Sequence, residues 1–312
     1  MKKGLQDSPL AARPQKGRVP EETLTRYANV LLDSVFKKIF GSEQNKDMLV
    51  ALIEQVLPGK KISSITYTNT VHTNDDPGKH DSVFDVECVD ALTGERFDVE
   101  IQKNYQPHYY DRTLYYSSLM IARQLEKGMR FYDFPPVYVI SLQDYVIHSP
   151  SEGFRFSYAI RNERTKELLT DKLNFVFLEL PNARGLDSPG VSTLEKTCYA
   201  LHNMTAFRNR PPELEGKFFE KLFELAEIAK FAPEERKQYE KTMLTERDKL
   251  DQLEWARMQG EEKGMEKGLE QGMKEGIEKG KTEDARNFKA LGVDIDTIAK
   301  ATGLDKAVVE AL

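Results

Sequence analysis

Residues 81–104, DSVFDVECVDALTGERFDVEIQKN, alternate apolar and polar side chains along two short runs, with a Thr93-Gly94 turn signal between them. An alternation with period two on both sides of a turn predicts a β-hairpin. One face of this hairpin is apolar and would join the core; it comprises Phe84, Val86, Cys88, Phe97, Val99 and Ile101. The other face is acidic and comprises Asp81, Asp85, Glu87, Asp98, Glu100 and Gln102.

A loop at residues 91–94 sets the register of this hairpin. It places Asp85 opposite Glu100 and Glu87 opposite Asp98, with Cβ atoms about 4.5–5.5 Å apart. Like charges at that separation repel, and a hard divalent cation such as Mg²⁺ would relieve the repulsion by binding carboxylate oxygens. The alternative is a solvated acidic face, on which water screens the repulsion and no ion binds.

Asp85, followed fifteen residues later by Glu100-Ile101-Gln102, resembles the Asp…(Asp/Glu)-X-Lys core of the PD-(D/E)XK nuclease superfamily, with Gln in place of Lys. More narrowly, the chain resembles the bacterial recombination-promoting nuclease and transposase family within that superfamily. The supporting segments are LDSVFKKIFG at 32–41, RTLYY at 112–116 and IAKATGL at 298–304. The likeness extends over about residues 28–312.

This resemblance implies a restriction-endonuclease-like α/β fold and metal-dependent endonucleolytic hydrolysis of DNA, in recombination, mobile-element or defence processes. Asp85 and Glu100, with the backbone carbonyl of Ile101, would hold Mg²⁺ or Mn²⁺, or another divalent cation. Gln102 departs from the superfamily lysine. A neutral amide can orient the attacking water or donate to a phosphate oxygen, but it supplies no positive charge and cannot act as a general base.

Four further residues are candidate accessory groups. Asp33, on the expected first helix, could help hold the metal, or it could simply interact with the helix dipole. Arg112 could form paired hydrogen bonds to a phosphate, and Tyr115 and Tyr116 could stack on a splayed base. The alternative for these three is an arginine paired with an acid and two half-buried aromatic rings.

The remaining periodicities complete an α/β prediction, with a mixed sheet flanked by helices over residues 21–190. Apolar residues spaced by three and four predict two helices within 21–57, broken near Gly41-Ser42 and ended by Pro58-Gly59. A longer helix is expected at 106–128. Strands are predicted at 62–71, 137–142, 154–160 and 174–180.

Composition bounds the class of protein. The chain has 312 residues, 39% of them hydrophobic, and a net charge of −6, which gives no overall attraction to nucleic acid. With neither an apolar run near the ~20 residues that span a bilayer nor an apolar signal region, the sequence predicts a cytoplasmic protein without a membrane partner. Cys88 and Cys198 are too few for a disulfide framework or a cysteine-based zinc site. Residues 1–20 predict a disordered basic arm.

The C-terminal part is expected to be helical, with a helical region at 191–258. Within residues 259–282 glycine recurs at every fourth position, at Gly260, Gly264, Gly268, Gly272, Gly276 and Gly280. On an α-helix this repeat drifts by about 40° each time, so it forms no straight seam. The segment is either a flexible charged spacer or a helix that lies close to a partner helix, as in a homo-oligomer.

Residues 283–312 predict three short helices with breaks near 291–292 and 303–304, spaced as in a helix-turn-helix unit. The last of them offers Asp305, Lys306 and Glu310 and no Arg, Asn or Gln. That composition favours a packing or self-association module over a reader of base edges.

DNA is the expected partner, and two rival classes of function remain. One is a non-catalytic nuclease-fold protein that associates with DNA or with itself. The other is a protein-interaction module that presents an acidic sheet face.

Overall fold

The computed structural model describes residues 25–68, 71–72, 82–83, 85–125 and 133–312. The expected basic arm, residues 1–20, and the hairpin positions Asp81 and Phe84 lie outside the described residues. Contacts group the chain into two compact units, Met1–Thr242 and Met243–Leu312. The finer boundaries expected at residues 20, 190, 258 and 282 stay predictions.

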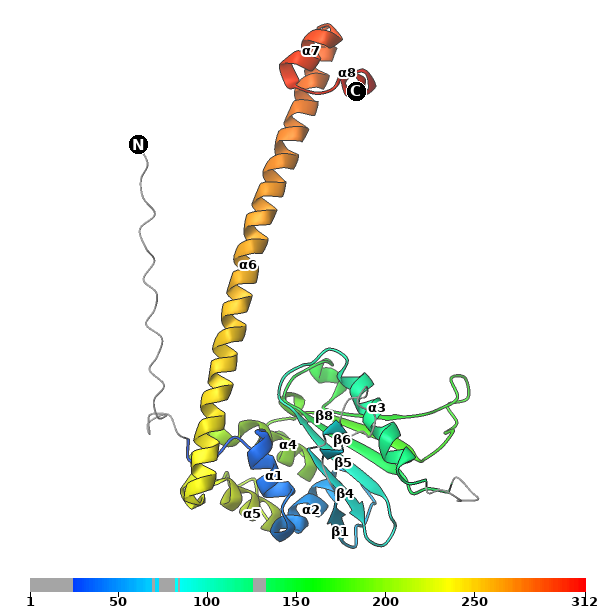
Figure 1. The fold of residues 1–312 in the computed structure, drawn as a ribbon, viewed down its shortest axis with the longest axis vertical. Helices are drawn as coiled ribbons and strands as arrows, with labels where there is room; N and C mark the ends of the chain where they lie inside the picture. The colour runs from blue at the N-terminus through cyan, green and yellow to red at the C-terminus, as the bar shows by residue number, and fades with distance from the viewer. Residues whose placement is uncertain (1–24, 69–70, 73–81, 84, 126–132) are drawn as a thin grey trace. The chain divides into compact units, whose positions relative to one another are not determined.

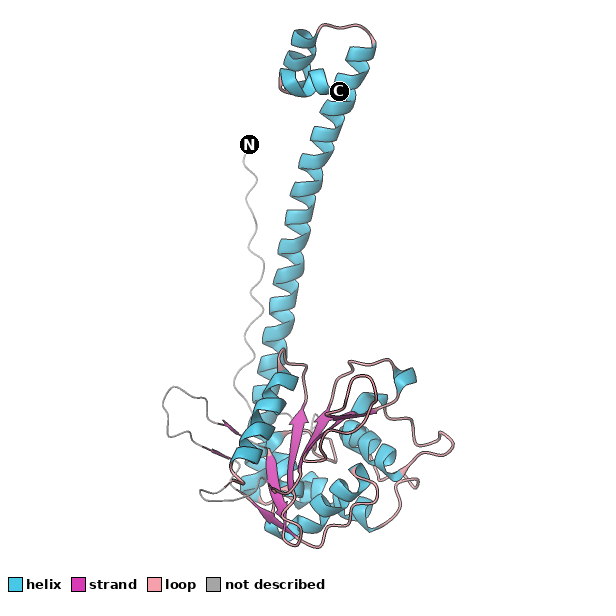
Figure 2. Ribbon diagram, turned by 90° about the vertical axis from the view of Figure 1, so that its right-hand side faces the viewer, coloured by secondary structure: helices cyan, strands magenta, loops and turns pink. Residues whose placement is uncertain are grey.

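The first unit is built on a six-stranded mixed sheet in the order β1-β4-β5-β6-β8-β7 (Figures 1 and 2). The strands β5, β6 and β8 run parallel to one another, and the outer pairs β1–β4, β4–β5 and β7–β8 are antiparallel. The bounds are β1 (Ile65–Tyr67), β4 (Val86–Asp90), β5 (Arg96–Gln102), β6 (Val137–Gln143), β7 (Arg155–Ala159) and β8 (Leu173–Glu179). A separate pair joins β2 (Val71–His72) to β3 (Ser82–Val83). The predicted α/β class with a mixed sheet is confirmed.

The β4–β5 hairpin has the predicted register where both strands are paired. Val86 lies opposite Val99, and Glu87 lies opposite Asp98. The turn is closed by Asp90, whose carboxylate accepts a hydrogen bond from the backbone of Leu92 at 2.7 Å, as short acidic side chains do in turns. Asp85 directly precedes β4, and the same register extended by one residue brings it beside Glu100.

Helices α1 (Asp33–Phe40) and α2 (Lys46–Val56) pack against the apolar face of the hairpin. At the end of α1, a Cβ atom added to Gly41 would lie 3.3 Å from a methyl group of Val86, so the helix and β4 are in close contact. The same side of the sheet also carries α4 (Thr193–Asn203) and α5 (Lys217–Ala226), as Figure 1 shows. Short 3-10 helices lie in the connections between the helices and strands of this unit: η2 (Glu43–Asn45), η3 (Pro150–Glu152), η4 (Leu180–Asn182), η5 (Met204–Ala206) and η6 (Ile228–Lys230).

The first predicted helix starts later than expected. Residues 25–32 are not helical, because their backbone pairs with a distant segment: Ala28 donates to the carbonyl of Ala226 at 2.8 Å, and Tyr27 forms a bridge with Glu227. The apolar residues in this stretch are buried all the same. Their spacing reflected burial rather than a helix.

Helix α3 (Tyr109–Ala122) connects β5 to the parallel strand β6 and covers the other face of the sheet. Its end packs through Met120 on Val137 and Leu173. Its start is fixed by a hydrogen bond of 2.7 Å between the Tyr109 hydroxyl and Ser141. The acidic face of the hairpin therefore lies on the covered side of the sheet.

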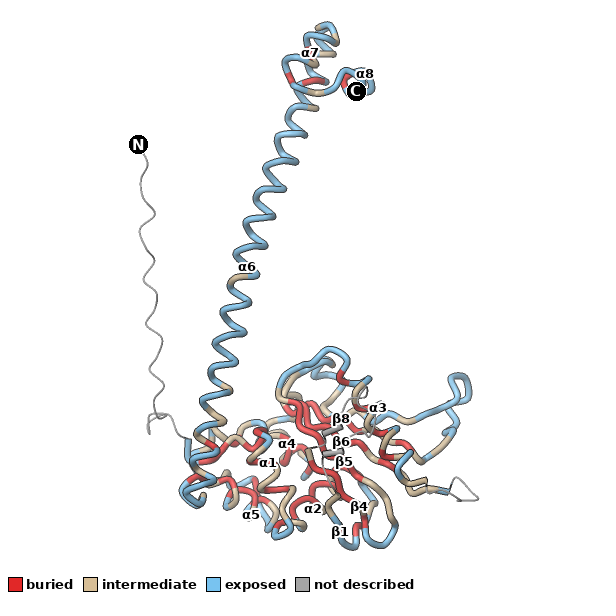
Figure 3. The backbone as a smooth tube through the Cα atoms, viewed as in Figure 1, coloured by how far each residue is buried: buried red, intermediate tan, exposed pale blue. Residues whose placement is uncertain are grey.

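The second unit contains most of α6 (Pro233–Ala290), followed by α7 (Ile295–Thr302) and α8 (Lys306–Ala311). Ala285, Ile298 and Val309 form its small core. The first of the three short helices predicted here is instead the end of the 58-residue α6, because the glycine repeat stays helical. Figure 3 shows α6 exposed along most of its length. Among the residues described, no helix has both the length and the apolarity to span a bilayer.

Candidate functional site

The acidic face of the hairpin is buried. Glu87 and Asp98 are each 1% exposed, Glu100 is 3% exposed and Gln102 is 7% exposed. The alternative of a solvated acidic face is therefore wrong, because α3 covers this side of the sheet. Figure 3 shows the strands concerned largely in red. Burying carboxylates without partners costs free energy, and such groups are kept where they do chemistry or bind an ion.

Several of these buried atoms have no hydrogen-bond partner. Both carboxylate oxygens of Asp98 and Oε1 of Glu100 are in this position. Glu87, by contrast, lies 3.5 Å from the guanidinium of Arg96. Nearly all buried polar atoms in folded proteins are satisfied, so the free oxygens of Asp98 and Glu100 need an explanation.

Asp85 is held at the end of this row by the backbone. Its Oδ2 accepts a hydrogen bond of 2.7 Å from the amide of Ile101, which lies between Glu100 and Gln102. The bond turns the carboxylate of Asp85 toward β5, beside Glu100. The structure thus brings Asp85, Glu100 and the backbone of Ile101 together, with Gln102 next along the strand.

The electrostatics of the cluster disfavour a second negative charge. Burial, and then the charge of Asp85, raise the pKa of Glu100 to about 8. Burial and the neighbouring carboxylates of Glu100 and Glu87 likewise raise the pKa of Asp98. Burial also raises the pKa of Asp85, although the bond from Ile101 opposes it. A cation among these groups would lower all three pKa values and favour the ionised forms.

Two basic side chains act on the cluster from different helices. Lys37 of α1 and Arg112 of α3 both lower the pKa of Asp85 and of Glu100 through their charge. Lys37 forms an ion pair of 2.7 Å with Asp33, one turn earlier on the helix. Asp33 itself is exposed and acts on Asp85 only through its charge. Lys37 was not identified from the sequence as a candidate site residue. Its spacing of four residues from Asp33, which places both side chains on one helix face, is the signal that could have identified it.

Arg112 is positioned by residues at the start of α3 and just before it. Its guanidinium donates to Gln106 at 2.8 Å and lies over the ring of Tyr109, 5.0 Å from its centre. Its Nε is buried and has no hydrogen-bond partner. One face of this guanidinium is thus packed, and part of its hydrogen-bonding capacity is free.

Tyr115 and Tyr116 lie further along α3. Tyr116 packs against the core around Val137, which pairs with Arg96, four residues before Glu100 on β5. At about 3.3 Å per residue, this is roughly 13 Å from Glu100 along the strand. Tyr115 is 39% exposed, next to Tyr116. Tyr116 therefore lies toward the Arg96 end of β5, away from Glu100.

A second polar row crosses the sheet beside the carboxylates. Gln102 is level with Gln143 of β6, and Gln143 is level with Glu179 of β8. Glu179 is bound by His148 at 2.6 Å and by Asn182 at 2.8 Å. The amide of Gln143 is fully buried and makes no hydrogen bond of standard geometry. Ser141 and Gln143 alternate at the end of a buried strand, and this polar alternation is the signal that could have identified them.

The cluster fits a cation that needs few protein ligands. Among the described residues, no three or more His, Cys, Asp or Glu side chains are arranged as a metal site. Mg²⁺ is commonly held by one or two carboxylates and keeps several waters. Asp85 and Glu100 provide two carboxylates, and Glu100 has a free buried oxygen.

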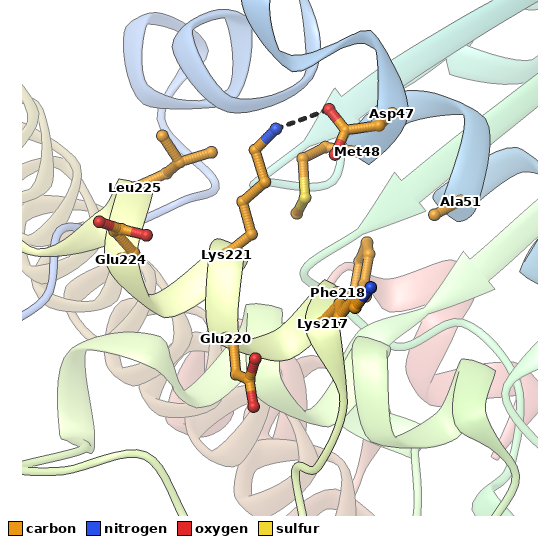
Figure 4. Close-up of a pocket in the computed structure, with 9 residues that line it drawn as sticks. All are labelled: Asp47, Met48, Ala51, Lys217, Phe218, Glu220, Lys221, Glu224 and Leu225. Carbon is orange, nitrogen blue, oxygen red and sulfur yellow. Dashed lines mark hydrogen bonds and ion pairs between the residues drawn. The ribbon is translucent and has the colours of Figure 1, made fainter.

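A hollow of about 510 Å³ between α2 and α5 lies elsewhere in the unit (Figure 4). It includes an ion pair of 2.6 Å between Lys221 and Asp47. Glu224 is similarly paired with Lys230. The hollow lies between helices on the apolar side of the sheet and does not include the buried carboxylates, so we assign it no role.

The model of a family described as "PD-(D/E)XK nuclease family transposase" matches residues 30–256. No curated protein and no solved structure matched the chain.

Proposed function

Because the chain belongs to the PD-(D/E)XK nuclease transposase family, we propose that it is a metal-dependent endonuclease that hydrolyses phosphodiester bonds in DNA. The observation that carries this proposal is the buried carboxylate of Glu100, which has a free oxygen beside Asp85. A purely structural hairpin would gain stability from apolar or paired groups at these positions. We assign the activity to recombination, mobile-element or defence processes; the word transposase in the family description supports a mobile-element role.

In this proposal Asp85, Glu100 and the carbonyl of Ile101 hold Mg²⁺ or Mn²⁺. When bound, the ion would polarise the phosphate and lower the pKa of a bound water, so that hydroxide is available near neutral pH. The bond from the Ile101 amide keeps Asp85 in place for this role. Burial of Glu100 keeps bulk water away, which strengthens the interaction of the carboxylate with a cation.

The neutral Gln102 leaves the site without the lysine of the superfamily motif. Gln102 can orient the attacking water through its amide. We assign the missing positive charge to Lys37, whose charge acts on both Asp85 and Glu100. The charge of Arg112, on α3, also acts on both carboxylates, and its planar guanidinium suits a phosphate.

A second candidate is a non-catalytic nuclease-fold protein that associates with DNA. Gln102 is the observation that favours it, because an amide cannot replace the charge of a lysine. In that case the buried carboxylates would still bind a cation, but the protein would not cut DNA.

Plasmid nicking in Mg²⁺ or Mn²⁺ separates the two candidates. We expect the wild-type protein to nick, and we expect Asp85→Ala and Glu100→Ala to remove both the nicking and the divalent-ion binding seen by calorimetry. Glu163→Gln, which changes an exposed carboxylate in a loop, is the control and should nick like the wild type. Ion binding without cleavage of DNA or RNA would support the non-catalytic candidate.

A further inference from the structure

An aromatic hollow lies on the same face of the sheet as the buried carboxylates. It has a volume of about 320 Å³ and lies between α3 and the strands β7 and β8. Its lining consists of Tyr110, Thr113, Leu114, Tyr158, Phe175 and Phe177. Tyr110 and Tyr158 are 40% and 45% exposed, so their rings are accessible from solvent. None of these lining residues carries a charge at neutral pH.

Strand register connects this hollow to the carboxylates. Glu100 is level with Ser141 on β6, and Ser141 is level with Phe177 on β8. Two strand spacings separate Glu100 from Phe177, or roughly 10 Å between their backbones. This span is comparable with the reach of one extended nucleotide from its phosphate to its base.

The chemistry of the hollow suits an uncharged planar group. The rings of Tyr110 and Tyr158 meet Phe177 edge-on, with centres 4.8 Å and 5.7 Å apart. Aromatic side chains of this kind stack on bases without regard to sequence. The hollow can therefore hold a base by stacking, whatever the identity of that base.

We propose that this hollow binds an unpaired nucleobase next to the phosphate that is cut. The inference rests on the proposed nuclease function and adds a substrate class to it. A base that remains stacked in a duplex cannot enter the hollow, because it must first leave its neighbours. The enzyme therefore prefers single-stranded DNA, or a duplex with a mismatched or extruded base, to a fully paired duplex.

Binding measured without cleavage tests the inference. Fluorescence anisotropy of a labelled oligonucleotide in chelator compares a single strand, the same strand in a duplex and the same strand with abasic sites. We expect the single strand to bind most tightly, and we expect Tyr158→Ala to weaken its binding about 5- to 150-fold. Tyr158→Phe keeps the ring and should restore most of the affinity. Trp255→Ala removes an exposed aromatic ring outside the hollow and should bind like the wild type.

Tyr158 lies on the edge strand β7 and is 45% exposed, so its truncation should leave the fold intact. Tyr110→Ala provides a second variant from the opposite wall. Equal binding of the single strand, the duplex and the abasic strand would overturn the inference. Unchanged binding in both tyrosine variants would also overturn the inference. The hollow would then bind a different group, such as a side chain of another protein. Because these readouts need no catalysis, they are independent of whether the protein cuts DNA in Mg²⁺ or Mn²⁺.

Discussion

At the scale of single residues, the main feature is that carboxylates are buried where a stable fold would place apolar groups. Asp98 and Glu100 are almost completely inaccessible and have oxygens without partners. Their burial costs free energy in the metal-free protein. The cost is offset if a cation binds, so stability and ion binding should be linked at these positions.

Glu100→Gln tests that linkage through pH. The pKa of Glu100 is raised to about 8 in the folded protein, so the folded state holds a proton that the unfolded state has released. The resulting stability is fully present below the ordinary pKa of about 4.3 and is lost as pH rises through about 8. In chelator, the melting temperature of the wild type should therefore fall as pH rises from about 4.3 to about 8 and change little from this cause above that. Glu100→Gln should fall less, and parallel curves for the two proteins would contradict the assignment.

Lys37→Met tests the source of the positive charge. If Lys37 takes the part of the superfamily lysine, this change should lower the rate of nicking on the order of 10²-fold, as expected for the loss of one electrostatic stabiliser. Melting temperature should change little, because the partner of Lys37 is the exposed Asp33. Lys61→Met is the control, since that side chain is 86% exposed. A wild-type rate for Lys37→Met would exclude Lys37 from catalysis.

At the scale of elements, the sequence predicted what depends on local pattern. The β4–β5 hairpin, its turn and the pairing of Glu87 with Asp98 follow from alternation and a short loop. The strands β6, β7 and β8 were also expected within a few residues of their observed bounds. Adjacent antiparallel strands joined by a short loop leave few alternative registers, which explains why the register of the β4–β5 hairpin was predicted.

Features set by long-range pairing were not predicted. The parallel pairing of β5, β6 and β8 places Ser141 and Phe177 level with Glu100, and nothing local in the sequence specifies it. The cover provided by α3, and therefore the burial of Glu100, depends on that same crossover. Residues 25–32 resembled a helix because their apolar spacing fits one, but their backbone bonds to the segment after α5.

Helix α6 allows a test of its glycine repeat. A Cβ atom at any of the six glycines would meet nothing within 4 Å, so alanine fits there. Gly264→Ala with Gly268→Ala should stabilise the helix by about 0.8–1.0 kcal/mol per site. Limited proteolysis within residues 260–280 should then be slower than in the wild type. A changed sedimentation coefficient would show instead that the glycines allow close approach of a second chain.

At the scale of the whole molecule, the family match and the two compact units do not coincide. The match to residues 30–256 covers the described part of the sheet unit from residue 30 onward and ends within α6. The module of α7 and α8 lies beyond it. In that module Lys306 forms an ion pair with Asp296, so its charge is engaged within the unit. The expected packing or self-association role of this module stays a prediction.

Divalent ions should stabilise the folded protein as a whole. A ligand that binds only the folded state adds about 2.7 kcal/mol at a hundredfold excess over its Kd. Addition of Mg²⁺ or Mn²⁺ after dialysis against chelator should raise the melting temperature of the wild type and leave that of Asp85→Ala unchanged. Equal shifts in both proteins would place the ion elsewhere.

Gly41 allows the end of α1 to lie close to β4 beside the candidate site. A methyl group there would lie 2.9 Å from the carbonyl oxygen of Lys37 and 3.3 Å from the side chain of Val86. The side chain of Lys37 is positively charged, and Val86 directly follows the acidic residue Asp85. The absence of one carbon atom therefore sets how closely the helix that bears the positive charge approaches the strand next to the negative one. Enlarging this position would separate two groups of opposite charge without altering either of them.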